Sequence, residues 1–343
     1  SQMPLKAAES RPALVVIEKL TIDFRTRAGT MRALHGLDLS IGQGEAVGIV
    51  GESGSGKSIT WLAALGLLGP SAMVGGSVRV DGREILGLGE TDLAGVRGKR
   101  IAMIFQDPTS SLNPVHRVGN QIIESLVRHR GMTQAAARAE ARRLLDRVQI
   151  ANAEQRLAEY PHELSGGMNQ RVMIAMALAG EPDLLIADEP TTALDMTIQA
   201  QILELRKEMR RDTGMALVII SHDLGVVAEL ADRVTVMYAG RAVEVAPVDR
   251  IFAHPAHPYT RGLLAALPEI DGPRRRLTAI PGQVPEPAAL PEGCAFAPRC
   301  PAAASECRHY VPTVVAAAPD HTAACIHIAR TLPALRQMES EPA

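Results

Sequence analysis

The sequence lacks a charge imbalance, because 36 lysines and arginines stand against 38 aspartates and glutamates, for a formal net charge of −2. Without a global positive field we expect no nucleic-acid partner. The chain also lacks an unbroken apolar run. Its longest uncharged stretch, residues 59–78, is interrupted by a Gly-Pro pair and a Gly-Gly pair. These breaks predict a helix followed by a turn and exclude a membrane span there.

The N-terminus lacks the basic-then-apolar pattern of a secretory signal. We interpret Ser1-Gln2 as a cloning remnant ahead of a native Met3. The sequence therefore predicts a protein that is made and kept in the cytosol, so that any membrane association depends on a partner. With 343 residues, 46% of them apolar and 22% charged, we expect a globular protein of two or so domains.

Cysteines are scarce, and none precedes residue 294. Disulfides are not expected in the cytosol, whereas four thiolates gathered at one point suit structural Zn²⁺ or an iron–sulfur cluster. The gaps of five, six and seventeen residues lack the C-x₂₋₄-C spacing of zinc ribbons. Spacing alone leaves zinc, a cluster and unliganded thiols open for Cys294, Cys300, Cys307 and Cys325.

A phosphate-binding motif follows the apolar run at residues 46–50. Residues 51–58 read Gly-Glu-Ser-Gly-Ser-Gly-Lys-Ser and fit G-x-x-x-x-G-K-[ST]. Glycines let backbone N–H groups converge on one point, to which the following helix adds its positive dipole end. A ligand-free glycine-rich turn is the alternative, but the strand stands where the motif requires it. We predict that a nucleoside triphosphate and Mg²⁺ are bound by Ser53, Gly54, Ser55, Gly56, Lys57 and Ser58.

Two acidic residues end a buried strand predicted at residues 184–187. Asp188 can hold Mg²⁺, directly or through water, and Glu189 can polarise a water for in-line attack on the γ-phosphate. A surface carboxylate pair is the alternative. Gln106, after the apolar strand at residues 101–105, offers an amide that can contact Mg²⁺ or water when the site closes.

A second anion site is predicted within residues 164–171, Leu-Ser-Gly-Gly-Met-Asn-Gln-Arg. A helical run begins directly after Ser165-Gly166-Gly167, and a helix N-terminus presents N–H groups to anions. His222 follows the apolar run at residues 216–220, so it lies at another strand end, where α/β ligands bind. A lone histidine is usually structural, but here we predict a role at the γ-phosphate.

Strand patterns begin the chain, at residues 14–24 and 33–41, with a hairpin at residues 77–87 around Asp81-Gly82. Phe24, one of only four phenylalanines, could stack on an adenine base or be an ordinary strand residue. Later apolar runs are continuous, as in buried parallel strands, and alternate with helices. The pattern predicts an α/β fold with a β-rich start.

From about residue 107 to 180 the apolar period becomes helical. Thr133 can cap a helix that continues to residue 150 and buries Ala141, Leu144, Leu145 and Val148. We expect a helical subdomain inserted into the α/β core. Proline density rises beyond residue 268, which indicates a linker into a separate cysteine-bearing piece. The predicted divisions are an N-terminal tail at 1–13, an ATPase domain at 14–268, an extension at 269–330 and a tail at 331–343.

Taken in order, the motifs resemble those of the ATP-binding-cassette (ABC) ATPases over residues 14–268. The resemblance implies a P-loop NTPase ABC cassette that hydrolyses ATP, with a mixed-sheet core, a β-rich subdomain and an inserted helical subdomain. It also implies that two cassettes associate head to tail, so that Ser165-Gly166-Gly167 of one closes on ATP held by Lys57 of the other. The matched motifs are Walker A (51–58), Q-loop (Gln106), signature (164–171), Walker B (184–189), D-loop (Ala193-Leu194-Asp195) and H-loop (His222).

A closer resemblance is to the ATP-binding subunits of dipeptide, oligopeptide and nickel importers. It rests on Phe-Gln-Asp-Pro at 105–108, His-Pro-Tyr-Thr-Arg-Gly at 257–262 and Pro-Arg-Cys-Pro at 298–301. Thr192, where the family often has Ser, is a small departure. The resemblance implies peptide import through two membrane permease subunits, with an extracytoplasmic solute-binding protein and a second cassette, favoured to be a paralogue. It places the protein at the cytoplasmic face of the inner membrane.

Some ATPases of that group hold a [4Fe–4S] cluster in a similar extension, so the resemblance favours a cluster over zinc on the four cysteines. Residues 291–328 also contain few apolar side chains with which to fold unaided. An importer ATPase for nickel or another small solute is one alternative function. A soluble ABC ATPase acting on DNA or ribosomes is another, but it would need long heptads or two cassettes in one chain, and neither is present.

Overall fold

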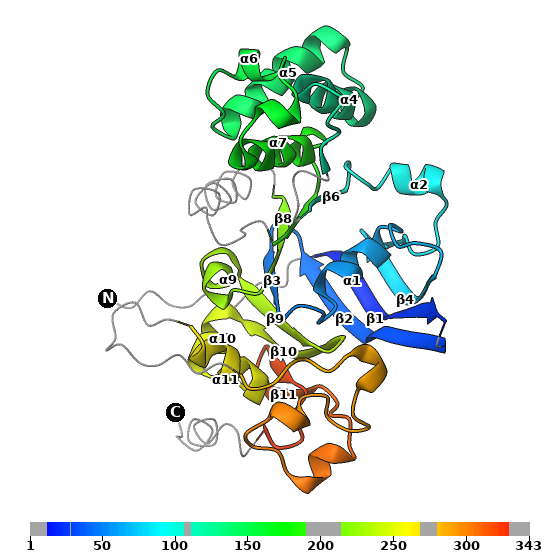
Figure 1. The fold of residues 1–343 in the computed structure, drawn as a ribbon, viewed down its shortest axis with the longest axis vertical. Helices are drawn as coiled ribbons and strands as arrows, with labels where there is room; N and C mark the ends of the chain where they lie inside the picture. The colour runs from blue at the N-terminus through cyan, green and yellow to red at the C-terminus, as the bar shows by residue number, and fades with distance from the viewer. Residues whose placement is uncertain (1–11, 28, 106–110, 190–213, 268–279, 329–343) are drawn as a thin grey trace, which may run out of the picture. The chain divides into compact units, whose positions relative to one another are not determined.

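The computed structural model describes residues 12–27, 29–105, 111–189, 214–267 and 280–328 (Figure 1). The chain falls into two compact units. The first comprises Ser1–Leu14, Ile41–Glu45 and Gly87–Ile220, and the second comprises Val15–Ser40, Ala46–Leu86 and Ser221–Ala343.

The core of the first unit is three parallel strands. β6 (Ile101–Ile104) pairs with β7 (Leu184–Asp188), and β7 pairs with β8 (Ala216–Ser221). Every residue of β7 and β8 is buried. The continuous apolar runs therefore form buried parallel strands, as the sequence predicts.

The helical part of the first unit lies between β6 and β7. Thr133 caps α5, its hydroxyl accepting the Ala136 N–H at 3.4 Å, and the four predicted apolar side chains of this region are buried. The expected helical insertion is thus confirmed within residues 111–180. Its elements are α4 (Val118–Arg130), α5 (Gln134–Arg147), α6 (Ala153–Arg156), a 3₁₀ turn η1 (Pro161–Glu163) and α7 (Gly166–Ala179), while α2 (Glu90–Ala94) precedes β6.

The second unit begins with an antiparallel sheet in the order β2-β1-β4-β5. Asp81 and Gly82 both have positive φ, 47° and 76°, as a two-residue hairpin turn requires. The predicted hairpin is confirmed, although its first strand starts earlier than residue 77. The strands are β1 (Ala13–Thr26), β2 (Gly29–Gly42), β4 (Ala72–Val80) and β5 (Arg83–Glu84).

A second sheet of this unit carries the phosphate motif. β3 (Ala46–Val50) is parallel to β9 (Arg233–Tyr238), which is antiparallel to β10 (Arg241–Pro247). Gly48 lets a helix approach β3, because an added Cβ would lie 2.1 Å from Val227 Cγ1. The helices of this unit are α1 (Lys57–Ala64), α9 (Leu224–Leu230), α10 (Val248–Ala253) and α11 (Pro258–Ala265).

The cysteine-bearing tail differs from the separate piece that the prolines suggest. Its strand β12 (His321–Ala323) pairs with β10, and β11 (Val315–Ala318) pairs with β12, so the tail continues the sheet of the second unit (Figure 1). The predicted boundary at residue 268 stays a prediction, because residues 268–279 lie outside the described ones. The tail also has 3₁₀ turns η2 (Pro287–Ala289), η3 (Ala297–Arg299) and η4 (Ser305–Arg308).

Buried polar contacts fasten this tail to the sheet. The Glu244 carboxylate on β10 accepts the N–H groups of Ala256 and His257 at 2.6 and 2.8 Å. It also lies 2.7 Å from His321 Nε2, and both side chains are fully buried. Since a buried carboxylate needs such partners, Glu244 fixes both the start of α11 and strand β12.

Candidate functional site

Residues 51–58 form a closed loop between β3 and α1. Gly54 and Gly56 have φ of 78° and 101°, which side chains rarely tolerate. A Cβ at Gly51 would lie 2.2 Å from the Met237 carbonyl oxygen and 2.8 Å from Ser55 Oγ. The Gly240 N–H donates to the Ser55 carbonyl at 3.0 Å, which fastens the loop to the turn between β9 and β10. The predicted loop conformation is therefore present.

Lys57 places its charge inside this loop. Its Nζ donates to the carbonyl oxygens of Gly51 and Glu52 at 2.7 and 3.0 Å, and the side chain is buried. The ammonium thus lies at the N-terminus of α1, where backbone N–H groups and the helix dipole also favour an anion. This concentration of positive charge and N–H donors suits the phosphates of a nucleotide.

The same loop carries a contact that the sequence analysis missed. The Glu52 N–H donates to the Tyr259 hydroxyl at 2.9 Å. Its carboxylate accepts two hydrogen bonds from the Arg299 guanidinium, at 2.6 and 3.0 Å. Arg299 lies 247 positions along the chain from Glu52, so no local pattern could identify this pairing.

Asp188 and Glu189 end β7 in the first unit. Asp188 is buried, and Glu189 adopts φ of 45°, with its N–H donating to the Ile220 carbonyl at 2.9 Å. A left-handed conformation at a residue other than glycine costs about 1–3 kcal/mol and is concentrated at functional sites. Two carboxylates thus follow one another at the end of the strand, and carboxylate oxygens suit Mg²⁺.

The second predicted anion site is the N-terminus of α7. The Ser165 hydroxyl accepts the Met168 N–H at 3.3 Å, and both Ser165 and Gly166 are exposed. A Cβ added to Gly166 would meet no atom within 4 Å. Packing among the described residues therefore gives no reason for glycine there, and these residues leave the helix N-terminus exposed.

The remaining predicted residues are placed as follows. His222 is exposed directly after β8, and Phe24 is half-buried on β1, opposite Ala72. Gln106 and Asp195 lie outside the described residues. The structure thus gathers the phosphate loop in the second unit, and Asp188 and Glu189 on one strand of the first. The catalytic roles of all these residues stay predictions.

All four cysteines line one small cavity of the tail, beside His257 and His327. None forms a disulfide. The Cys294 N–H donates to the Cys307 carbonyl at 2.8 Å, which joins the first and third cysteine segments. Burial raises the pKa of the Cys294, Cys300 and Cys325 thiols. The four cysteines therefore share one cavity, and their predicted role as metal ligands stays a prediction.

The donor set bears on which metal group could fit. Among the described residues, no three histidine, cysteine or acidic side chains converge closely enough to hold one metal ion. The described positions of these side chains therefore support neither zinc nor an iron–sulfur cluster, and the metal-binding role of the cysteines stays a prediction.

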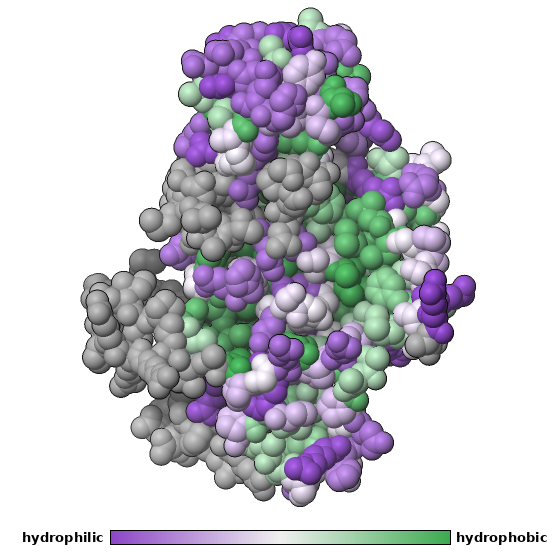
Figure 2. Space-filling model, viewed as in Figure 1, coloured by the Kyte–Doolittle hydropathy of each residue, from purple (hydrophilic) through white to green (hydrophobic). Residues whose placement is uncertain are grey.

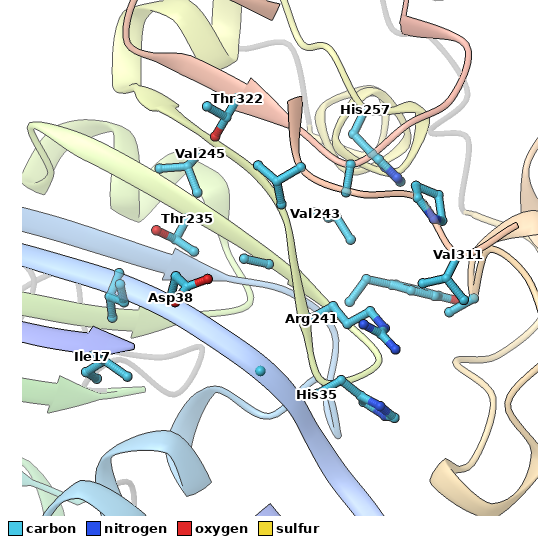
Figure 3. Close-up of a pocket in the computed structure, with 18 of the residues that line it drawn as sticks. Ile17, His35, Asp38, Thr235, Arg241, Val243, Val245, His257, Val311 and Thr322 are labelled. Atoms are coloured by element: carbon cyan, nitrogen blue, oxygen red, sulfur yellow. The ribbon is translucent and has the colours of Figure 1, made fainter. Parts of the chain in front are cut away.

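A second hollow shares His257, Cys294 and Phe296 with the cysteine cavity as lining residues (Figure 3). Its volume is about 490 Å³, and it lies between β1, β2, β9, β10 and the tail. In Figure 3 the side chains of His35 and Arg241 project toward the same side of this hollow. Burial, followed by the nearby charges of Arg241 and Arg32, lowers the pKa of His35 to about 4.

Figure 2 shows mostly hydrophilic residues over the helical region, with apolar side chains gathered elsewhere on the visible face. No helix among the described residues has both the length and the hydrophobicity to cross a membrane.

Comparison with known proteins gives two family matches. Residues 34–192 match the model described as ABC transporter, and residues 243–307 match that of the oligopeptide/dipeptide transporter C-terminal region. The chain is 48% identical over 325 residues to the oligopeptide transport ATP-binding protein OppD of Salmonella typhimurium, covering 95% of this chain and 97% of that protein. It is also 48% identical over 314 residues to AppD of Bacillus subtilis, another oligopeptide transport ATP-binding protein, covering 91% and 96%.

Among solved structures, the chain is similar to the ATP-binding cassette MJ0796, a dimer in a post-hydrolysis state with ADP and phosphate. The TM-score is 0.62 and the identity 29%, over 68% of this chain and 98% of that one. The expected fold class is therefore confirmed.

Proposed function

Starting from the premise that this chain belongs to the ABC transporter family, among its oligopeptide transport ATP-binding proteins, we propose that it is the ATP-hydrolysing subunit of a peptide importer. The observation that carries this proposal is the phosphate loop, closed around Lys57 at a helix N-terminus with no room for a side chain at Gly51. The tail match to oligopeptide/dipeptide transporters supports the peptide class of cargo.

Each predicted site residue has its own proposed role in ATP hydrolysis. Mg²⁺ would be held by Ser58, Asp188 and Gln106, and it would draw charge away from the phosphates. Glu189 orients and polarises the attacking water, with His222 and Gln106 contacting the γ-phosphate. Phe24 stacks on the adenine. Nucleotide contacts come from Ser53, Gly54, Ser55, Gly56, Lys57 and Ser58, and from Asp195 at the contact between cassettes.

A second cassette would complete each site. The exposed N-terminus of α7 supports this, because Ser165-Gly166-Gly167 offers an anion-binding helix end that nothing in the described chain covers near Gly166. We propose that it closes on ATP bound by the partner, and that the partner is a paralogue. Hydrolysis then removes the shared phosphate and lets the pair separate.

An importer ATPase works with membrane permease partners, as the relatives' role in oligopeptide transport implies. We propose two permease subunits and an extracytoplasmic solute-binding protein. The chain would lie at the cytoplasmic face of the inner membrane, attached peripherally through its helical region.

The four cysteines would hold a [4Fe–4S] cluster. Their shared cavity and the resemblance of the tail to other peptide-importer ATPases support this proposal, whereas among the described residues no group of three ligand side chains is placed to hold a metal ion. When bound, the cluster would cross-link tail segments that have few apolar side chains of their own. Iron and acid-labile sulfide in anaerobically purified protein would support it. Colourless protein containing zinc and no iron would contradict it.

Uptake in cells tests the transport function. A strain lacking this gene should fail to accumulate a radiolabelled tripeptide, and the wild-type gene should restore uptake where Glu189→Gln does not. Unchanged tripeptide uptake in the deletion strain, with loss of nickel uptake, would select the nickel-importer alternative. Unchanged uptake of both the tripeptide and nickel would contradict the proposal that this protein is an importer ATPase.

A further inference from the structure

The pairing of Glu52 with Arg299 joins the phosphate loop to the cysteine-bearing tail. The guanidinium meets the carboxylate in a two-pronged arrangement, Nη1 to Oε2 at 2.6 Å and Nη2 to Oε1 at 3.0 Å. The side chains are only 5% and 33% exposed. Buried, forked pairs of this kind are the strong and directional ones, in contrast to exposed ion pairs.

Arg299 is held rigidly in this position. Its Nε donates to the Pro281 carbonyl at 2.8 Å, and Nη2 also reaches the Gly282 carbonyl at 3.2 Å. The Tyr238 ring lies beside the guanidinium, 5.9 Å from its carbon to the ring centre. Since nearly every donor is engaged, the guanidinium cannot rotate away from Glu52 without losing several hydrogen bonds.

Aromatic rings surround the same contact. The rings of Tyr238 and Tyr259 are 4.7 Å apart, and Phe296 packs on both at 5.2 and 5.3 Å. Tyr259 also accepts the Glu52 N–H. Both the backbone and the carboxylate of Glu52 are therefore fixed by residues of α11 and the tail.

Arg299 also belongs to the cysteine cavity's own framework. It ends the η3 turn, in which the Ala297 N–H donates to the Cys294 carbonyl at 3.0 Å and the Cys300 N–H donates to the Ala297 carbonyl at 3.3 Å. The turn thus runs from one cavity cysteine to the next. Any group that draws the cysteines together also fixes the position of the guanidinium.

Glu52 poses an electrostatic problem for a phosphate-binding loop. Its carboxylate puts a negative charge on the loop that receives a triphosphate, and like charges at such short range repel. Arg299 neutralises that charge from the side of the tail.

We propose that Arg299 is a positioning residue for ATP binding, which neutralises Glu52 and thereby makes nucleotide affinity depend on the state of the cysteine-bearing tail. It acts through Glu52 and does not itself touch the nucleotide. The inference rests on the proposed ATP site and adds a route by which the tail controls it.

The first test is equilibrium binding of a fluorescent ATP analogue with Mg²⁺ to the purified chain. Arg299→Gln should bind about tenfold more weakly, because it exposes the Glu52 charge. Arg299→Lys should restore part of the affinity, and Glu52→Gln combined with Arg299→Gln should restore most of it. Equal affinity of Arg299→Gln and wild type, or a double variant as weak as the single one, would overturn the proposal.

The second test asks whether the tail acts through this contact. Cys300→Ser should weaken nucleotide binding in the wild-type background and have no further effect in the Glu52→Gln, Arg299→Gln background. Equal weakening in both backgrounds would show that the cysteine acts by another route. Iron content and thermal unfolding, measured on each variant, separate loss of the tail group from loss of the fold. A wild-type chain that bound no nucleotide would defeat the proposed ATP site itself.

A separate observation concerns the hollow of Figure 3. Arg241 lines it, its side chain makes no hydrogen bond or ion pair within the described part of the chain, and burial lowers its pKa. His35 Nε2 is buried there without a partner among these residues. Apolar side chains line most of the remainder, including Val243, Val245 and Phe296. A volume of about 490 Å³ falls in the range of small-molecule sites.

The geometry points to a binding site for a small organic carboxylate with an apolar body, its charge on Arg241 and His35. Saturation-transfer NMR with N-acetylleucine should detect binding that N-acetylleucine amide and inorganic phosphate do not reproduce. Arg241→Gln should abolish it while the fluorescent ATP analogue still binds. No transfer to the wild type, equal transfer with Arg241→Gln, or binding of phosphate alone would overturn this assignment.

Discussion

The two anion-binding turns of this chain are built differently. Residues 51–58 are held from several directions, by Gly240, Tyr259 and Arg299, with Lys57 buried inside. Residues 165–167 depend on a cap from Ser165 to the Met168 N–H and are largely exposed. The first turn is therefore held by contacts within its own chain, whereas the described residues leave the second turn exposed.

The largest expected effect comes from removing the water-activating carboxylate. Glu189→Gln should lose turnover by two or more decades, at least about 2.7 kcal/mol of barrier, because the amide cannot polarise the attacking water. ATP binding should persist. The measurements are single-turnover hydrolysis and equilibrium nucleotide binding, and near-normal hydrolysis would exclude Glu189 from this role.

The same variant tests the exposed turn. Because ATP is retained, cassettes should accumulate as pairs on size-exclusion chromatography with Mg²⁺ and ATP, in the presence of a competent partner cassette. Adding Ser165→Arg should disperse them, since the bulky side chain blocks the helix end. Pairs that survive that change would show that residues 165–167 do not complete a partner's site.

The next effect concerns affinity. Lys57→Ala removes the ammonium inside the phosphate loop and should weaken nucleotide binding about ten- to a hundredfold, as for loss of a charged hydrogen bond. Calorimetric titration with Mg²⁺ and ATP measures it. If Lys57→Ala and Glu189→Gln bound ATP equally well, the division between binding and chemistry would be wrong.

Alanine at one glycine of each turn compares the two directly. Gly51→Ala should destabilise the fold by about 1–3 kcal/mol, because its Cβ overlaps the Met237 carbonyl. Gly166→Ala should instead stabilise by up to about 1 kcal/mol, since the position is helical and open. Urea unfolding measures both. A destabilising Gly166→Ala would show that this turn is constrained by its own chain after all.

The sequence predicts local features of this molecule more fully than contacts between residues that are distant in the chain. The phosphate loop is recognisable because its glycines and lysine stand at fixed spacing within eight consecutive residues. The contact of Arg299 with Glu52 spans most of the chain, and nothing local to either residue distinguishes it from ordinary surface charges. Likewise β12 has only three residues, His-Thr-Ala, and gains its strand structure from pairing with β10.

Glu189 is predicted only in part. The sequence identifies its carboxylate from the preceding strand, but not its left-handed backbone, which comes from the chain turning after β7 toward the Ile220 carbonyl. The gathering of the four cysteines was predictable from their exclusive location in the tail. Which metal group they suit depends on how the sulfurs are spaced around the cavity, and that is a tertiary property.

The smallest expected effect is a pH dependence of the free energy of unfolding, which we attribute to His35. The backbone N–H of His35 donates to the Gly240 carbonyl, and the backbone N–H of Gly240 in turn donates to the Ser55 carbonyl of the loop. Burial, with Arg241 and Arg32 nearby, lowers the pKa of His35 from 6.5 to about 4, and Asp23 opposes this weakly. The unfolded chain therefore binds more protons between these values, so stability should fall as pH drops from about 6.5 to about 4. His35→Gln should flatten this part of the urea-unfolding profile. An unchanged slope would mean that protonation of the His35 ring does not cause this pH dependence of stability.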